Sequence, residues 1–222
     1  MSNRTFRGLA LCLAFLLLGA ALAGCTAATP ATTTTVPVTT TTVPATTGSL
    51  DPQVTYYADI VIRDYGTITV KLEPTAAPIT VAHFVELAES GFYNGLTFHR
   101  IMEGFMMQGG DPDGDGYANA GQETIYGEFA ANGWNNPLSH TRGAISMARS
   151  SLPNSATSQF FIVHQDSDFL DGSYAVFGYV TQGIEVVDAV CKAAQPINNN
   201  GAISPEEQPV MTSVTIRTEP NP

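Results

Sequence analysis

The chain has 222 residues, of which 44% are hydrophobic, and a net charge of −11 at pH 7. This size and apolar content suffice for one well-buried domain or two small ones. Such an acidic chain lacks the charge that draws a protein to nucleic acid or to anionic lipid headgroups, so we expect no nucleic-acid partner.

The first residues have the order of an export signal. Arg4 and Arg7 precede an apolar run over residues 9–22, and Leu22-Ala23-Gly24-Cys25 follows at once. This run is shorter than the ~20 apolar residues that a membrane-spanning helix needs, and a small-residue processing site ends it. We therefore predict that residues 1–24 form a signal peptide.

The four residues that end at Cys25 resemble the bacterial lipobox, in which the cysteine is lipidated and the signal is cut before it. The resemblance implies that Cys25 becomes a lipidated N-terminus. Each buried acyl CH₂ contributes about 0.8 kcal/mol, and two or more chains hold where one is marginal. We expect an extracytoplasmic protein anchored to a bacterial membrane, on the cell surface or the periplasmic face. An ordinary signal peptide with an incidental cysteine is the alternative.

The remaining cysteines predict no internal disulfide. Cys12 would leave with the signal and Cys25 would carry lipid, so Cys191 has no partner. Cys191 has apolar spacing from Ile184 and Val187 on a predicted helix, where a small buried hydrophobe is the ordinary interpretation.

Residues 25–53 are predicted to be the lipidated cysteine and a tether. From Thr26 to Ser49 the chain is almost entirely Thr, Ala, Val and Pro, without charges or aromatic residues. Such a tract cannot bury a core and is typical of an extended, semi-stiff spacer. An O-glycosylated tether and an unmodified disordered one both stay open.

Residues 54–218 are predicted to form the globular domain, and residues 219–222 a short tail. Eight segments have the composition and period of short strands. They are residues 55–64, 66–73, 97–102, 105–108, 143–148, 158–164, 175–180 and 210–217. In the last segment, every second residue from Val210 to Ile216 is placed on one half-buried face.

Two further segments, residues 78–90 and 183–193, have helical periodicity. Pro78 suits a first helical turn, and Gly91 suits a helix end. Closing a sheet into a barrel removes its edge strands, and helices can cover the open ends. We therefore expect an all-β dominated fold, a closed eight-stranded antiparallel β-barrel capped by two α-helices.

Several sequence blocks occur together in the predicted domain. The first two are Phe98-His99-Arg100-Ile101 and Gly104-Phe105-Met106-Met107-Gln108-Gly109-Gly110-Asp111. The others are residues 125–128, 143–148, 158–162, 170–172 and 176–178. In content and order these blocks resemble the cyclophilins. The resemblance covers nearly the whole domain and implies the cyclophilin fold and peptidyl-prolyl cis/trans isomerase activity.

The residue expected to carry this activity is Arg100. Amide resonance sets a rotation barrier of about 18–20 kcal/mol. In the twisted transition state the nitrogen regains a lone pair, so a donor aimed at it binds that state best. Arginine is always protonated and offers directional donors. Strand alternation places Phe98 and Arg100 on one face and His99 on the other, so we predict that Arg100 is catalytic in a dry pocket. A surface arginine in an ion pair is the alternative.

The resemblance also implies a substrate-binding set. Its apolar members would surround the proline ring, its glutamines would bond the substrate backbone, and residues 148–149 would run beside the peptide opposite Gly121. The set is Phe105, Met106, Gln108, Gly121, Ala148, Arg149, Gln159, Phe161, Phe169, Leu170 and Tyr174.

Three members of this set depart from the common pattern of the family. Phe169 and Tyr174 stand where many relatives have tryptophan and histidine, and Arg149 replaces a common asparagine. Preferences for the residues that flank proline are therefore not fixed by the resemblance.

The predicted reaction breaks no bond, so we expect no cofactor. The run Asp111-Pro112-Asp113-Gly114-Asp115-Gly116 imitates the opening of a calcium loop, but Gln122 stands where the closing acid belongs. The histidines have no ligand spacing, so we expect no metal site.

The expected partners are proline-containing polypeptides, and the chain is expected to be a monomer because it has no heptads. Two other functions compete with catalysis. A binding module would hold proline segments without turnover, and an adhesion or scaffold protein would use the anchor and tether. Neither gives a reason to keep Arg100 together with Phe105, Gln108 and Phe161.

Overall fold

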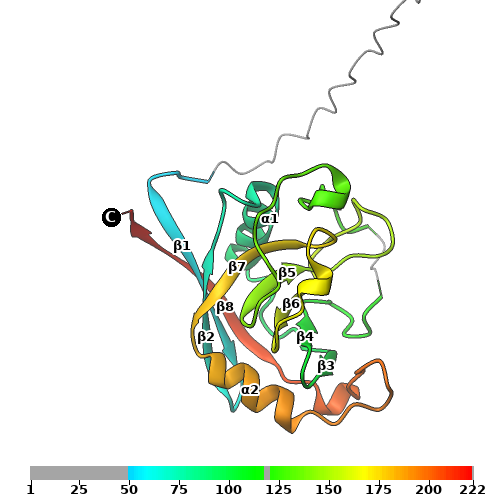
Figure 1. Cartoon of the computed structure of the whole chain (residues 1–222). Coiled ribbons are helices and arrows are strands. Elements are labelled where there is room, and N and C mark those ends of the chain that lie inside the picture. Colours follow the sequence, from blue (N-terminus) through cyan, green and yellow to red (C-terminus); the bar gives the residue numbers. More distant parts are fainter. Residues whose placement is uncertain (1–49, 118–120, 222) are drawn as a thin grey trace, which may run out of the picture. The chain divides into compact units, whose positions relative to one another are not determined.

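The computed structural model describes residues 50–117 and 121–221 (Figure 1). The predicted signal peptide, Cys25 and the predicted tether up to residue 49 lie outside these residues. The strands are β1 (Val54–Ile62), β2 (Gly66–Leu72), β3 (Arg100–Met102), β4 (Met106–Gly109), β5 (Ala144–Met147), β6 (Phe160–Val163), β7 (Ala175–Gln182) and β8 (Met211–Pro220). The helices are α1 (Pro78–Glu89) and α2 (Ile184–Ala193), with short 3₁₀ turns at Ala130–Asn132, Asp168–Leu170 and Pro205–Glu207.

The eight strands form one antiparallel sheet in the order β3-β4-β6-β5-β7-β2-β1-β8. In Figure 1 the sheet curls, with α1 near one end and α2 near the other. The prediction of an all-β dominated fold with two helices is confirmed. In the described part of the chain, neither helix has the length and apolar content to cross a membrane.

The closed barrel is not confirmed, because no hydrogen-bonded ladder joins the edge strands β3 and β8. The free edge of β3 pairs instead with the connector that follows α2. Ile101 N–H donates to Gly201 O at 2.8 Å, and Ile203 N–H donates to His99 O at 2.9 Å. The edge is therefore covered by a loop rather than by the last strand, which is one of the ways that proteins protect edges.

The predicted alternation of β8 is wrong at its start. The β1–β8 register shifts between Val61 and Ile62, so that Met211 rather than Thr212 takes the buried position. A bulge of this kind adds one residue to a strand and moves the side chains beyond it to the other face.

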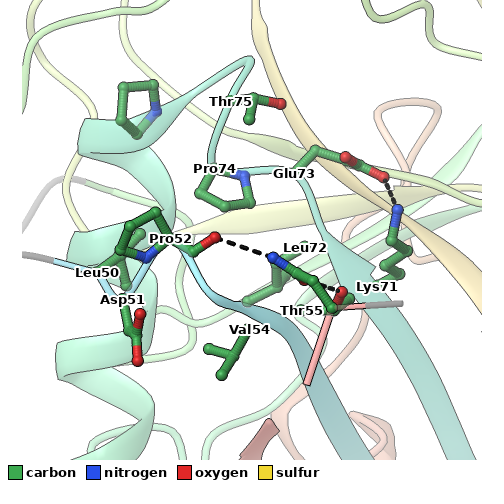
Figure 2. Close-up of a pocket in the computed structure, with 12 residues that line it drawn as sticks. Leu50, Asp51, Pro52, Val54, Thr55, Lys71, Leu72, Glu73, Pro74 and Thr75 are labelled. Carbon is green, nitrogen blue, oxygen red and sulfur yellow. Dashed lines mark hydrogen bonds and ion pairs between the residues drawn. The ribbon is translucent and has the colours of Figure 1, made fainter. Parts of the chain in front are cut away.

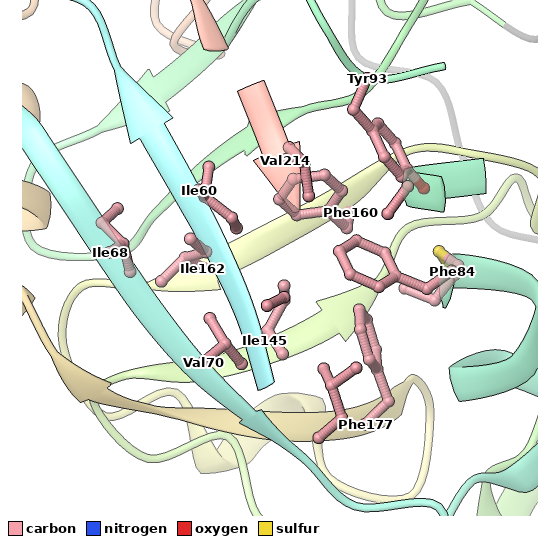
Figure 3. Packing of buried hydrophobic residues seen from close by; sticks show 14 of the residues in the cluster. Ile60, Ile68, Val70, Phe84, Tyr93, Ile145, Phe160, Ile162, Phe177 and Val214 are labelled. Atoms are coloured by element: carbon pink, nitrogen blue, oxygen red, sulfur yellow. The ribbon is translucent and has the colours of Figure 1, made fainter. Parts of the chain in front are cut away.

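The main core joins the inner face of the curled sheet to the buried residues of α1 and α2, and Figure 3 shows part of it. Phe160 of β6 meets the rings of Phe84, Tyr93 and Phe98 edge to face at 5.5–6.1 Å between centroids. Cys191 of α2 belongs to this core, as predicted, and burial raises the pKa of its thiol to about 12. A buried thiol that stays protonated is a poor nucleophile, so Cys191 contributes to core packing.

Helix α1 is capped from outside its own sequence. Its N-cap residue, Ala77, offers no side-chain acceptor. The buried carboxylate of Glu128 accepts instead from Ile79 N–H at 3.0 Å and from Thr80 N–H at 2.8 Å. Burial raises the pKa of Glu128, and the two backbone donors oppose that rise. The carboxylate thus satisfies two donors that a helix start leaves free and faces the positive end of the helix dipole.

Glu128→Gln keeps the shape of the side chain but turns an amide NH₂ toward one of these two backbone donors. We expect the free energy of unfolding to fall by about 1–3 kcal/mol, measured by urea titration. The exposed Glu123→Gln should change it by less than about 0.5 kcal/mol. Equal stabilities of the two variants would contradict the capping role.

Candidate active site

A cavity of about 170 Å³ opens beside β3, β4 and β6. Its lining combines aromatic and aliphatic side chains with one amide and two guanidinium groups. The lining residues are Arg100, Phe105, Met106, Gln108, Ala148, Arg149, Phe161, Leu170 and Tyr174. The structure thus brings these predicted site residues around one hollow, which we call the proline pocket after its expected ligand.

Arg100 begins β3 and pairs in register with Gln108 of β4. Its Nε donates to Asn200 O at 2.7 Å, and its Nη1 donates to Gln108 Oε1 at 3.2 Å. Its other donors face the thioether sulfurs of Met102 and Met106, at 3.3 and 3.8 Å, and its Cζ lies 5.8 Å from the Phe105 ring centroid. Burial lowers the pKa of Arg100. The cation is therefore held by neutral acceptors, and two of these are weak ones.

The predicted placement of Phe98 on the same face as Arg100 is wrong. Phe98 lies in the main core against Phe160, whereas Arg100 lines the proline pocket. The reason is local, since β3 starts only at Arg100, and Phe98 and His99 lie between it and the isolated bridges of Thr97. Alternation cannot be extended beyond the paired residues.

The remaining predicted residues lie outside the lining. Gln159 accepts from Gln108 Nε2 at 2.9 Å and donates to Tyr117 O at 3.1 Å. Phe169 is 70% exposed, and its ring lies 5.6 Å from that of Phe105. Gly121 is exposed, at a positive φ, with open space where a Cβ would lie. Gln159 and Phe169 are thus connected to the pocket through its lining, and Gly121 has no contact with it that the structure records.

Sequence reasoning did not find the turn at residues 198–201, which orients Arg100. Gly201 has a φ of +85°, and a Cβ there would lie 2.4 Å from Met102 Cγ. This close approach lets the turn lie against β3, where Asn200 O meets Arg100 Nε. The Asn-Asn-Asn-Gly run at residues 198–201 is typical of a turn and could have marked it, but nothing in the run indicates that the turn meets Arg100.

A buried histidine, also not anticipated, supports the pocket from behind. His140 has its ring centroid 5.9 Å from that of Phe161, with the planes 11° apart, and lies edge-on to Tyr174 at 6.4 Å. Its Nδ1 is 2.7 Å from Asp171 Oδ1, and its Nε2 is 3.0 Å from Ser146 Oγ. His140 thus connects β5, β6 and the segment that carries Leu170.

The hydrogen bond to Asp171 places a proton on Nδ1 of His140, because an ionised carboxylate can only accept. The Ser146 hydroxyl can donate to Nε2 of a neutral ring or accept from it if the ring is charged. Burial lowers the pKa of His140, against the opposing influence of Asp171. Burial alone would raise the pKa of Asp171, but the hydrogen bonds from Ser139 and His140 lower it overall. The neutral ring beside an ionised carboxylate is the state that these shifts favour.

Asp171, His140 and Ser146 have the order of a hydrolase triad. His140 and Ser146, however, are each 0% exposed, so no substrate can reach the Ser146 oxygen. The arrangement therefore positions Phe161 rather than attacking a substrate.

A larger cavity, of about 470 Å³, lies at the start of β1 (Figure 2). Most of its polar groups hydrogen-bond to one another. Asn221 bonds Pro52 O and Thr55 Oγ1, each at 2.9 Å, and Lys71 pairs with Glu73 at 2.8 Å. Asp51, the remaining charged residue of the lining, accepts from Gln53 N–H at 2.8 Å, and the lining has no pair of groups suited to acid–base chemistry.

The acidic loop that imitates a calcium site folds on itself. Asp111 Oδ2 accepts from the backbone N–H groups of Asp115 and Gly116 at 2.9 and 2.7 Å. Within residues 50–117 and 121–221, no group of three or more His, Cys, Asp or Glu side chains is arranged to hold a metal ion.

Comparison with known proteins points to one family. The family model for cyclophilin type peptidyl-prolyl cis-trans isomerases matches residues 57–217. Peptidyl-prolyl cis-trans isomerase B of Bacillus subtilis is 46% identical over 125 residues, 56% of this chain and 83% of that protein. Peptidyl-prolyl cis-trans isomerase B of Escherichia coli is 38% identical over 161 residues, 69% of this chain and 95% of that protein.

Solved structures of the same family are similar in fold to this chain. A cyclophilin type peptidyl-prolyl cis-trans isomerase of Cryptosporidium parvum is similar with a TM-score of 0.63 and 27% identity, covering 75% of this chain and 99% of that one. A structure of the same protein in the presence of the dipeptide Ala-Pro has a TM-score of 0.61 and 29% identity, covering 73% of this chain and 99% of that one.

The His140 network makes a prediction for activity on a prolyl peptide. His140→Asn removes the ring behind Phe161, and we expect kcat/KM per folded molecule to fall about tenfold or more, because small misplacements of a binding wall are costly. The folded fraction is measured by circular dichroism. Glu128→Gln, which weakens the fold away from the pocket, serves as the control and should keep its kcat/KM. A His140→Asn variant as active as the wild type would contradict the positioning role.

Proposed function

The chain belongs to the cyclophilin-type peptidyl-prolyl cis-trans isomerase family, and from that premise we propose that it isomerises X-Pro bonds of proteins outside the cytoplasm, with Arg100 as the catalytic residue. The enzyme class follows from the family. The observation that supports the residue is a half-buried guanidinium, without a carboxylate partner, on the wall of an apolar pocket.

Prolyl isomerisation requires stabilisation of a twisted amide and no bond cleavage. As the C–N bond rotates, its nitrogen gains a lone pair that the planar ground states lack. An N–H donor aimed at this nitrogen stabilises the transition state more than either ground state and so raises the rate. The N–H groups of Arg100 that face Met102 and Met106 can turn to such a nitrogen at small cost, since thioethers are weak acceptors.

The other members of the predicted set would hold the substrate. Phe105, Phe161 and Leu170 offer apolar walls for a proline ring, and a dry wall strengthens the electrostatic contribution of the nearby cation. The amides of Gln108 and Gln159 would bond the peptide backbone on one side of the rotating bond. The Cryptosporidium parvum relative whose structure was solved in the presence of Ala-Pro supports proline-containing substrates for this family.

The place of action is proposed from the sequence alone. The lipobox resemblance at Cys25 and the tether that follows it would hold a monomeric domain at a short distance from a bacterial membrane. Uncatalysed X-Pro isomerisation takes about 10–100 s, long enough to limit the folding of exported proteins. An isomerase tethered where such proteins emerge would shorten that step.

Arg100→Ala removes the proposed donor from the pocket. We expect kcat/KM on a prolyl peptide to fall by about 100-fold, the scale found when one transition-state donor is lost. Arg100→Lys should recover only part of the loss, because lysine keeps the charge without the planar fork. The exposed Arg63→Ala is the matched control and should keep wild-type kcat/KM. A variant Arg100→Ala that keeps its activity would reject the mechanism.

Cys25→Ser tests the anchor. The substitution removes the thiol that lipid would modify, so we expect the protein to move from the membrane fraction to the soluble fraction of bacteria that express it. Cys191→Ser, which removes the buried thiol instead, should leave the fractionation unchanged. Membrane association that survives Cys25→Ser would contradict lipid anchoring and leave the isomerase proposal untouched.

A further inference from the structure

The proline pocket carries positive charge in a strongly acidic protein. Its lining holds two arginines, Arg100 and Arg149, and no acid, whereas the whole chain has a net charge of −11. Among residues 50–117 and 121–221, the ion pairs that the structure records include neither of these guanidinium groups. The two charges therefore face the pocket without a local counter-charge.

The guanidinium of Arg149 is fixed in place. It stacks between the rings of Phe129 and Tyr174, 4.8 and 4.7 Å from their centroids. Its Nε and Nη2 donate to Ser173 O at 3.0 and 2.7 Å, and its Nη1 donates to Ser150 O at 2.9 Å. These bonds use one N–H of each nitrogen, so each terminal nitrogen keeps a second N–H. A charge held this way needs no further ordering to meet a ligand.

Two other arginines of the domain are paired with acids, whereas the exposed Arg63 has no recorded ion pair among the residues that the structure describes. Arg142 makes a two-pronged pair with Asp188 at 2.7 and 2.8 Å, and Arg217 pairs with Asp59 at 3.1 Å. Asp111, in the acidic loop, accepts from the backbone of its own loop. Within the described ranges, the two half-buried guanidinium groups of the pocket thus lack the counter-charge that Arg142 and Arg217 have.

We propose that Arg149 makes the pocket prefer peptides with an acidic side chain next to the proline. The inference rests on the proposed isomerase function and adds a substrate class to it. A cleft with low-dielectric walls concentrates the field of its own charges, so a nearby carboxylate is attracted locally even though the protein as a whole repels it. The net charge of the chain alone favours the opposite choice, a basic substrate.

The experiment compares three peptides, acetyl-Ala-Xaa-Pro-Phe-amide with Glu, Gln or Lys at Xaa, on the full-length protein. Isomerisation is followed by NMR exchange, which needs no coupling protease, and kcat/KM is obtained for each peptide. We expect the Glu peptide to exceed the Lys peptide by about threefold or more, the scale of a partly exposed ion pair. The ratio should shrink as salt is raised from low concentration to about 0.5 M.

Three variants separate charge from structure. Arg149→Gln should bring the Glu/Lys ratio to one or below, while Arg149→Lys should keep it above one because the charge remains. Arg142→Gln changes the net charge by the same amount away from the pocket and should keep the wild-type ratio. A purely structural role of Arg149 would change all three peptides equally and leave the ratio where it was.

The outcomes are distinguishable from failure of the proposed function. If the Gln peptide is not isomerised by the wild-type protein, the isomerase proposal itself fails. If it is isomerised but the Glu/Lys ratio is one or less, or does not respond to salt, only the acidic preference is overturned. The salt series on the wild-type protein decides this even if Arg149→Gln fails to fold.

Discussion

The site depends on holding a cation against an apolar wall without a counter-ion. Arg100 is bound by the carbonyl of Asn200, the amide of Gln108 and two thioethers, none of which carries charge. A carboxylate in their place would neutralise the field that the proposed mechanism needs, and bare solvent would screen it. The fold meets this constraint by pairing the edge of β3 with the connector at 201–203, which brings a backbone acceptor to Arg100 without adding an acid.

The opposite wall of the pocket depends on β6, whose two faces contact different parts of the domain. On β6, Phe160 enters the main core and Phe161 lines the proline pocket, so the wall of the site is attached directly to the main core. His140 then fixes Phe161 from behind, with its tautomer set by Asp171. Arg149 donates to Ser173 O and so holds the segment that carries Tyr174. Rigid support on several sides is what a site that acts by position rather than by chemistry requires.

Much of this could be predicted because it is periodic or local. The eight strands, the two helices and the buried Cys191 follow from spacing along the chain. Three features could not be predicted in this way: how the sheet edge is covered, the β8 bulge, and the side of the strand on which Phe98 lies. Each depends on where strand pairing begins or on which segment covers an edge. The same holds for His140 and Asp171, which are 31 residues apart and meet only in the fold. The placement of Arg100 among neutral acceptors was equally beyond any local pattern.

The most direct test is to observe the Arg100 side chain while a substrate binds. In ¹⁵N-labelled full-length protein, the Arg100 Nε–H resonance can be assigned with Arg100→Lys and followed during titration with acetyl-Ala-Ala-Pro-amide. Catalysis at Arg100 predicts a saturable shift and exchange broadening of this resonance, absent with a peptide in which alanine replaces proline. A resonance that stays unchanged at saturation, or that responds equally to both peptides, would contradict the placement of catalysis at Arg100.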